Sequence, residues 1–155
     1  MNSNEVLISL VLPIHNEEGN IPELYARAKK VLSNIGGYEI IFVNDGSQDI
    51  SLKKLLEICD KDKSAKVIDF SRNFGHQMAI TAGISHATGQ TVVVMDSDLQ
   101  DPPEIISDLF AKWRDGFEVV HAKRKTRQDG FMKKITAFIF YRIMRRLANV
   151  DIMED

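Results

Sequence analysis

The chain has 155 residues, 44% of them hydrophobic and 27% charged, which is typical of a single soluble globular domain with a sizeable core. A single cysteine, Cys59, excludes an internal disulfide bond and favours a reducing compartment. Residues 1–5 are polar and lead directly into a strand pattern, so we expect no signal peptide. No apolar run reaches the roughly 18 residues of a membrane span.

The formal net charge of −2 is unevenly distributed along the chain. Residues 1–122 hold 11 Lys and Arg against 18 Asp and Glu, whereas residues 123–155 hold 9 against 4. An acidic body with a basic end lacks the continuous basic surface of a nucleic-acid-binding domain. We therefore expect no nucleic-acid partner, and the basic end needs a local explanation.

Strand and helix patterns alternate along the chain. Short apolar runs predict strands at 6–12, 39–43, 66–70, 92–95 and 118–122. Helical spacing of apolar residues predicts helices at 20–35, 52–59, 76–87, 104–113 and 131–149. The first helix has the pattern of a capping box, with Asn20 followed by Glu23 and with Pro22 in the first turn. This alternation predicts an α/β fold with a doubly wound, parallel sheet.

Polar clusters follow four of the predicted strands. They are His15-Asn16-Glu17, Asn44-Asp45-Gly46-Ser47, Ser71-Arg72-Asn73 and Asp96-Ser97-Asp98. In an open parallel sheet the carboxyl ends of the strands meet at one edge, and ligands bind there. We therefore expect the functional site at this edge.

Asp96 and Asp98 follow a β-branched run that is typical of a strand buried on both faces. In an extended chain, side chains two residues apart point the same way, so both carboxylates can face one point. Two close carboxylates favour a hard divalent cation such as Mg²⁺ or Mn²⁺ between them. The competing interpretation is an acidic turn that caps the following helix.

The sequence also bears on other classes of functional site. The chain has neither G-x-G-x-x-G after its first strand nor G-x-x-x-x-G-K-[ST], which disfavours dinucleotide and P-loop enzymes. Asp45 could accept a hydrogen bond from a nucleobase, with Gly46 allowing close backbone approach, or its turn could cap the next helix. A phosphatase of the haloacid-dehalogenase class also carries Asp-x-Asp after a strand. In that class the motif lies near the N-terminus, whereas here it follows the fourth predicted strand. A non-catalytic nucleotide-binding module is a third possibility.

Three segments resemble successive motifs of inverting GT-A glycosyltransferases of the family 2 type. These are Val-Leu-Pro-Ile-His-Asn-Glu-Glu at 11–18, Val-Asn-Asp-Gly-Ser-Gln-Asp at 43–49 and Met-Asp-Ser-Asp-Leu-Gln-Asp-Pro-Pro at 95–103. Ser-Arg-Asn-Phe-Gly-His at 71–76 is similar to the polyprenyl-phosphate branch, which includes dolichyl-phosphate mannose synthase and bactoprenol glucosyltransferases. The resemblance covers nearly the whole chain and implies one Rossmann-like GT-A domain over 1–155.

The resemblance implies roles by position. Asp96 and Asp98 would hold Mg²⁺ or Mn²⁺ on the diphosphate of the donor and act in catalysis, and Arg72 and Arg124 would contact phosphate. The residues expected to bind the donor nucleotide are Pro13, His15, Glu17, Asp45, Gly46, Ser47, Asp96, Ser97, Asp98 and Gln100. Two positions depart from the family pattern: His15 stands where many relatives have Tyr, and Asn44 replaces a common Asp.

The implied reaction moves a hexose from a nucleotide-diphosphate sugar to a polyprenyl phosphate with inversion. UDP-glucose or a related UDP-hexose is the favoured donor, with GDP-mannose next. An alternative is a saccharide acceptor for cell-wall or surface polysaccharide. A phosphate monoester with a second pKa near about 6 is largely ionised at neutral pH. Cationic positioning, for example by the basic residues 123–127, should therefore matter more than base catalysis.

The basic end predicts a membrane-surface helix. Residues 131–149 place apolar side chains on one broad face and Lys and Arg opposite, as in an interfacial helix, although a core helix with a basic outer face has the same pattern. We expect a cytoplasmic protein at the inner face of the membrane. Relatives of the family continue past this helix, and Asp155 would be the first residue of their next, catalytic motif. We therefore expect this chain to have an incomplete acceptor side, so that it binds the donor nucleotide but transfers little sugar. We also expect it to form homo-oligomers when no lipid is present.

Overall fold

The computed structural model describes residues 6–122. The chain divides into two units, Met1–His121 and Ala122–Asp155, and the described residues belong to the first unit apart from Ala122. The predictions for Arg124, for the basic residues 123–127, for the helix at 131–149 and for Asp155 lie outside the described residues.

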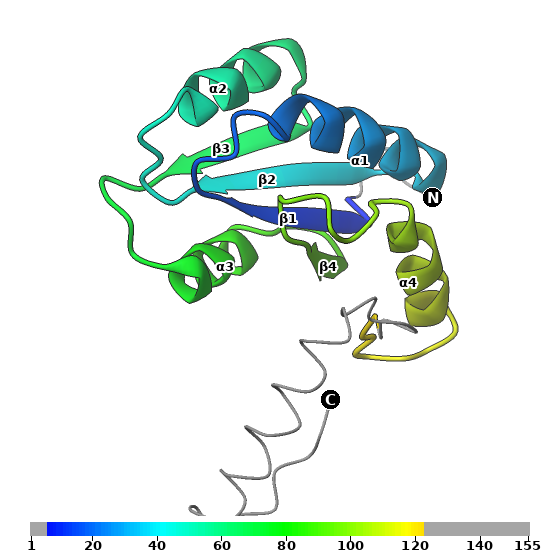
Figure 1. The fold of residues 1–155 in the computed structure, drawn as a ribbon. Helices are drawn as coiled ribbons and strands as arrows, with labels where there is room; N and C mark the ends of the chain where they lie inside the picture. Colours follow the sequence, from blue (N-terminus) through cyan, green and yellow to red (C-terminus); the bar gives the residue numbers. More distant parts are fainter. Residues whose placement is uncertain (1–5, 123–155) are drawn as a thin grey trace, which may run out of the picture. The chain divides into compact units, whose positions relative to one another are not determined.

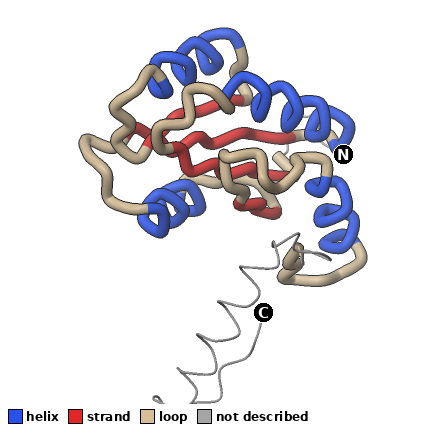
Figure 2. Tube along the Cα trace, in the orientation of Figure 1, coloured by secondary structure: helices blue, strands red, loops and turns tan. Residues whose placement is uncertain are grey.

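Four strands and four helices alternate in the described part (Figures 1 and 2). They are β1 Ile8–Ile14, α1 Ile21–Ile35, β2 Tyr38–Asn44, α2 Ser51–Lys61, β3 Ala65–Asp69, α3 His76–Ser85, β4 Thr91–Val94 and α4 Ile105–Arg114. Each of the eight was predicted, with bounds that differ by at most two residues. Within residues 6–122, no helix combines the length and the apolar character needed to cross a membrane.

The strands form one parallel sheet in the order β3-β2-β1-β4. The register of β1 against β2 runs from Ile8 opposite Tyr38 to Ile14 opposite Asn44. The first three strands add in one direction and β4 then pairs with the other side of β1, so the order reverses between β1 and β4. A crevice forms at such a reversal, outside the carboxyl ends of the strands. The predicted parallel α/β fold is confirmed.

Helices cover both faces of the sheet. Figure 1 shows α1 and α2 on one side and α3 on the other. Residues of α1, α2 and α4 share the larger hydrophobic core with the sheet, and α3 packs on β1 and β2 over a smaller one. A Cβ atom at Gly83 of α3 would lie 2.2 Å from Val11 Cγ1, so glycine is what lets α3 lie this close to β1. With helices on both faces of the sheet, all seven residues of β1 are buried.

Three local predictions are wrong. Residues 118–122 do not form a strand, and β4 pairs only with β1 among the described strands, which leaves Val94 40% exposed rather than buried on both faces. The capping box is also absent: the backbone of Asn20 is already helical (φ −90°, ψ −27°) and its side chain makes no cap. Asn20 Nδ2 instead donates to Glu17 Oε2 at 2.6 Å.

A buried carboxylate ties the strands together at their amino ends. Glu39 of β2 accepts hydrogen bonds from Ser9 Oγ of β1 and from Lys66 Nζ of β3, each at 2.6 Å. It also accepts from the backbone and hydroxyl of Thr88, just before β4. Burial alone raises the pKa of the Glu39 carboxyl, but these hydrogen bonds outweigh burial and lower that pKa to about 2. This network lies at the end of the sheet opposite the polar clusters.

Candidate functional site at the carboxyl edge of the sheet

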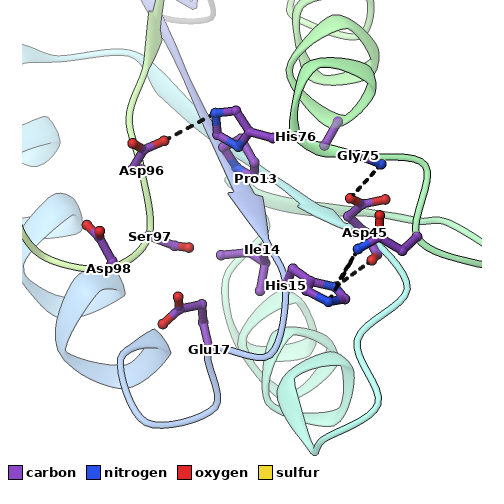
Figure 3. Close-up of a pocket in the computed structure, with 12 residues that line it drawn as sticks. Pro13, Ile14, His15, Glu17, Asp45, Gly75, His76, Asp96, Ser97 and Asp98 are labelled. Carbon is purple, nitrogen blue, oxygen red and sulfur yellow. Dashed lines mark hydrogen bonds and ion pairs between the residues drawn. The ribbon is translucent and has the colours of Figure 1, made fainter. Parts of the chain in front are cut away.

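A cavity of about 310 Å³ lies at the carboxyl ends of the strands, where the strand order reverses (Figure 3). We call it the rim pocket. Its lining residues are Pro13, Ile14, His15, Glu17, Asp45, Asn73, Gly75, His76, Ala79, Asp96, Ser97 and Asp98. Two of the four polar clusters, at 15–17 and 96–98, therefore contribute most of their residues to it, and the other two contribute Asp45 and Asn73.

Asp96 and Asp98 lie on the β4 side of the rim pocket. Both side chains are exposed and Ser97 between them is buried, which is the alternation expected of an extended chain. Asp98 Oδ1 accepts a hydrogen bond from the backbone of Gln100 at 3.0 Å, and Leu99 between them adopts a left-handed conformation (φ 60°). Asp98 thus binds within its own turn, and Glu104 at the start of α4 makes no side-chain cap, so neither of these two residues caps that helix. Gln100 itself does not line the rim pocket.

Asp45 lies at the β2 end of the rim pocket and is only 4% exposed. Its two carboxylate oxygens accept hydrogen bonds from the backbone N–H groups of Phe74 at 2.7 Å and of Gly75 at 3.0 Å. The alternative in which Asp45 caps α2 is wrong, because its carboxylate binds Phe74 and Gly75, and the backbone N–H of Ser51 at the start of α2 donates to Asp49 Oδ1 at 2.9 Å instead. Each carboxylate oxygen can accept a further hydrogen bond, so the side chain remains able to bind a ligand.

Gly46 was expected to let the backbone come close to a nucleobase. In the structure it instead lets the backbone of Arg72 and Asn73 come close to the turn after β2. Its φ of 63° is left-handed, and a Cβ atom there would lie 2.4 Å from both Arg72 C and Asn73 N. No L-side chain fits at that distance. The turn after β2 is therefore fitted directly against residues 71–76.

The ring of His15 is held at the mouth of the rim pocket by polar contacts at both of its nitrogens. Its Nδ1 lies 2.8 Å from the carbonyl oxygen of Asp45, which can only accept, so we assign the ring proton to Nδ1. Its Nε2 then accepts from the side-chain amides of Asn16 at 3.1 Å and Asn73 at 3.3 Å. These contacts fix the plane of the imidazole where a flat ligand group can lie against it.

The remaining predicted residues lie beside the rim pocket. Ser47 and Arg72 line a second cavity of about 550 Å³, together with Gly46, and the two cavities share His15 and Asn73. The guanidinium of Arg72 stacks 4.8 Å above the ring of Phe74. The structure thus separates Arg72 from the Asp96–Asp98 carboxylates rather than placing it among them.

Five lining residues had no predicted role in the site: Ile14, Asn73, Gly75, His76 and Ala79. Two of them, Asn73 and His76, have polar side chains and belong to the 71–76 motif. Asn73 contacts His15, and His76 Nε2 lies 3.5 Å from Asp96 Oδ1 (Figure 3). Their contacts join positions 58 residues apart in the first case and 20 residues apart in the second. No local spacing indicates such contacts, so only the unexplained motif itself was a signal.

The rim pocket suits an open cation site rather than a closed one. Among the described residues, no group of three or more His, Cys, Asp or Glu side chains could enclose a metal ion. Two exposed carboxylates beside a cavity match the way Mg²⁺ is commonly bound, by one or two carboxylates with water and substrate phosphates completing the shell. Asp96 and Asp98 therefore fit a cation that arrives with a phosphate ligand.

The fold is shared with a solved structure. Residues 1–349 of TarS from S. aureus, solved in complex with UDP, align with a TM-score of 0.57 at 21% identity, over 80% of this chain and 40% of that one. At this identity the likeness concerns the fold, and it supports the predicted GT-A type.

Relatives were found over nearly the whole sequence. The chain is 48% identical over 155 residues to the uncharacterized glycosyltransferase YkcC of Bacillus subtilis, covering 99% of this chain and 48% of the relative. It is 40% identical over 151 residues to the prophage bactoprenol glucosyl transferase homolog of Escherichia coli, covering 96% and 49%. The chain thus spans about half the length of these relatives. The model of the glycosyl transferase family 2 matches residues 9–152, and the chain belongs to this family.

Proposed function

We propose that the protein transfers a hexose from a nucleotide-diphosphate sugar to a polyprenyl phosphate, with inversion and with a divalent cation. The observation that carries this proposal is the rim pocket, which collects His15, Glu17, Asp45, Asp96 and Asp98 at the reversal point of the sheet. Family membership supports glycosyl transfer and disfavours the phosphatase. The names of two similar proteins, one solved with UDP and one a bactoprenol glucosyl transferase homolog, support the donor and the acceptor.

The two ends of the rim pocket suit the two ends of a nucleotide-sugar donor. The nucleobase would lie toward His15 and Asp45, where a fixed flat ring and a buried carboxylate offer stacking and hydrogen bonding. The diphosphate would lie toward Asp96 and Asp98, because only a bridging cation brings those negative groups together. Glu17, Pro13 and Ser97 line the wall between the two ends.

The chain contributes positioning and charge to the transfer. Asp96 and Asp98 would hold the cation, which stabilises the negative charge that develops on the leaving nucleoside diphosphate. The acceptor phosphate is already ionised at neutral pH, so the described residues need to orient it rather than deprotonate it. Arg72 faces the neighbouring cavity and would contact a phosphate that extends there. The proposal also includes a phosphate contact by Arg124 and a catalytic role for Asp155.

The identities of donor and acceptor are separate parts of the proposal. We place UDP-glucose or a related UDP-hexose first and GDP-mannose second, and a saccharide acceptor is the alternative to the lipid. A basic helix at 131–149 would hold the protein at the inner face of the membrane. Thermal-shift measurements with UDP, GDP, CDP and ADP rank the bases, and a preference for ADP would contradict the proposed donor class. Transfer of labelled hexose to a polyprenyl phosphate, compared with a saccharide, decides the acceptor.

Calorimetry tests the cation-dependent donor site. UDP should bind with Mn²⁺ present and at least about 10-fold more weakly with EDTA, because the carboxylates then repel the diphosphate. Asp96→Asn and Asp98→Asn should each remove most of this difference, whereas Asp60→Asn, on the exposed surface of α2, should behave as the wild type. Equal affinity with Mn²⁺ and with EDTA in the wild type would contradict the proposed role of the cation.

A further inference from the structure

Residues 71–76 contact the carboxyl ends of three strands. Asn73 contacts His15 after β1, Phe74 and Gly75 bind Asp45 after β2, and His76 reaches Asp96 after β4. These segments are far apart in the sequence. One short loop therefore connects the His15 end of the rim pocket to its carboxylate end.

The position of His76 is set by this loop. Two hydrogen bonds hold the backbone of Phe74 and Gly75 on the buried carboxylate of Asp45, directly before α3 begins at His76. The φ of 96° at Gly75 turns the chain into the helix. On the other side, the loop lies against Gly46 with no room for a Cβ atom. His76 is thus the first helical residue after an anchored turn, and its side chain points at Asp96 (Figure 3).

The contact is made to one oxygen of the carboxylate. His76 Nε2 lies 3.5 Å from Asp96 Oδ1, and both side chains are about half exposed at the rim pocket. A carboxylate with one oxygen held by a neighbouring donor keeps its second oxygen in a defined direction. Metal-binding carboxylates are commonly held this way by an outer partner, and loss of that partner typically weakens metal affinity about 10–100-fold.

We propose that His76 is a positioning residue that holds Oδ1 of Asp96 and thereby directs Oδ2 toward the divalent cation of the donor. The inference rests on the proposed function, since it requires that Asp96 binds this cation. It gives the 71–76 motif a role: the loop carries the outer partner of the metal-binding carboxylate and is itself anchored by Asp45.

Binding of Mn²⁺, followed by electron paramagnetic resonance with saturating UDP, tests the inference. His76→Ala should weaken Mn²⁺ binding about 10-fold or more, the range seen when outer partners are lost. His76→Gln should restore most of the affinity, because its amide can donate to the same oxygen. His86→Ala is the matched control, since His86 lies at the other end of α3 and bonds to the carbonyl of Ala82. Circular dichroism establishes that each variant is folded.

Affinity for UDP in EDTA separates positioning from direct contact with the nucleotide. The inference expects His76→Ala to leave this metal-free affinity unchanged. An equal loss of UDP affinity with and without metal would overturn it, as would wild-type Mn²⁺ affinity in a folded His76→Ala protein. If the wild type shows no metal-dependent binding of UDP, the proposed function fails and this inference fails with it. A metal-dependent wild type with an unaffected variant refutes the inference alone.

Discussion

Glu39 provides the sharpest test of the energetics of the sheet. Its carboxylate is 3% exposed and accepts hydrogen bonds from Ser9, Lys66 and Thr88, so it joins β1, β2, β3 and the segment before β4. Burial raises the pKa of this carboxyl, yet the hydrogen bonds, that of Lys66 foremost, lower it from 4.5 to about 2. The unfolded chain lacks these partners and keeps the ordinary pKa.

The difference between the two pKa values sets the stability that ionised Glu39 contributes. A carboxyl whose pKa falls on folding stabilises the native state above its unfolded pKa and loses that contribution as the pH falls toward its folded pKa. A shift from 4.5 to about 2 corresponds to about 3 kcal/mol at pH 7 and about 1 kcal/mol at pH 3. We therefore predict that Glu39→Gln lowers the free energy of unfolding by about 3 kcal/mol at pH 7, and by much less at pH 3.

Urea denaturation at both pH values measures this effect. The pKa of Asp62 is also lowered in the folded protein: burial raises it, but hydrogen bonds from Tyr25, Lys29 and Ser64 prevail. That group titrates equally in the wild type and the variant, so the difference between the two proteins isolates Glu39. Glu57→Gln on the exposed face of α2 should change stability by less than about 0.5 kcal/mol at either pH. A Glu39→Gln effect of the same size at pH 7 and pH 3 would refute the reasoning.

Three further substitutions test the packing around the rim pocket. Gly46→Ala should destabilise the fold by about 2 kcal/mol or more and abolish nucleotide binding, because the φ of 63° at Gly46 and the backbone of Arg72, 2.4 Å from a Cβ atom there, leave no place for that atom. Thermal denaturation measures the first effect and UDP calorimetry measures the second. Asp45→Asn should cost about 1–3 kcal/mol, since the amide nitrogen cannot accept one of the two backbone hydrogen bonds, and faster amide hydrogen exchange at Phe74 would report it. Gly83→Ala should cost about 1–3 kcal/mol in urea denaturation with little change in UDP affinity, because α3 must move from β1; unchanged stability in any of the three would contradict the corresponding contact.

The sequence predicts most of the fold because its signals are local. Apolar runs with polar turns between them identified all eight elements of the described part, and parallel strands place their carboxyl ends together by necessity. The strand expected at 118–122 shows the limit of this reasoning. Its apolar pattern needs a neighbouring edge to pair with, and Val119 is instead 71% exposed. A strand pattern does not say which edge is available, and the exposure of Val94 on β4 was missed for the same reason.

In the candidate site, too, the local arrangement of residues could be predicted and the long-range contacts could not. The side-by-side arrangement of Asp96 and Asp98 follows from their spacing of two, and the alternation around Ser97 agrees with it. The partners of Asp45 lie 29 and 30 residues away, and a helix cap is what local spacing suggested for its turn. Contacts of this kind depend on how the third βα connection crosses the sheet edge, which no residue pattern near Asp45 records.

The burial of Asp45 has a consequence for how the rim pocket responds to a ligand. A carboxylate that already binds two backbone N–H groups can accept a third hydrogen bond from a nucleobase only in the geometry that those two leave free. The same two bonds hold the loop that places His76 against Asp96. Nucleobase binding at one end and cation binding at the other therefore act on one anchored loop. Loss of the Asp45 anchor should therefore change the affinities for nucleotide and metal together, whereas substitutions of His76 or of Asp98 should act on the metal first.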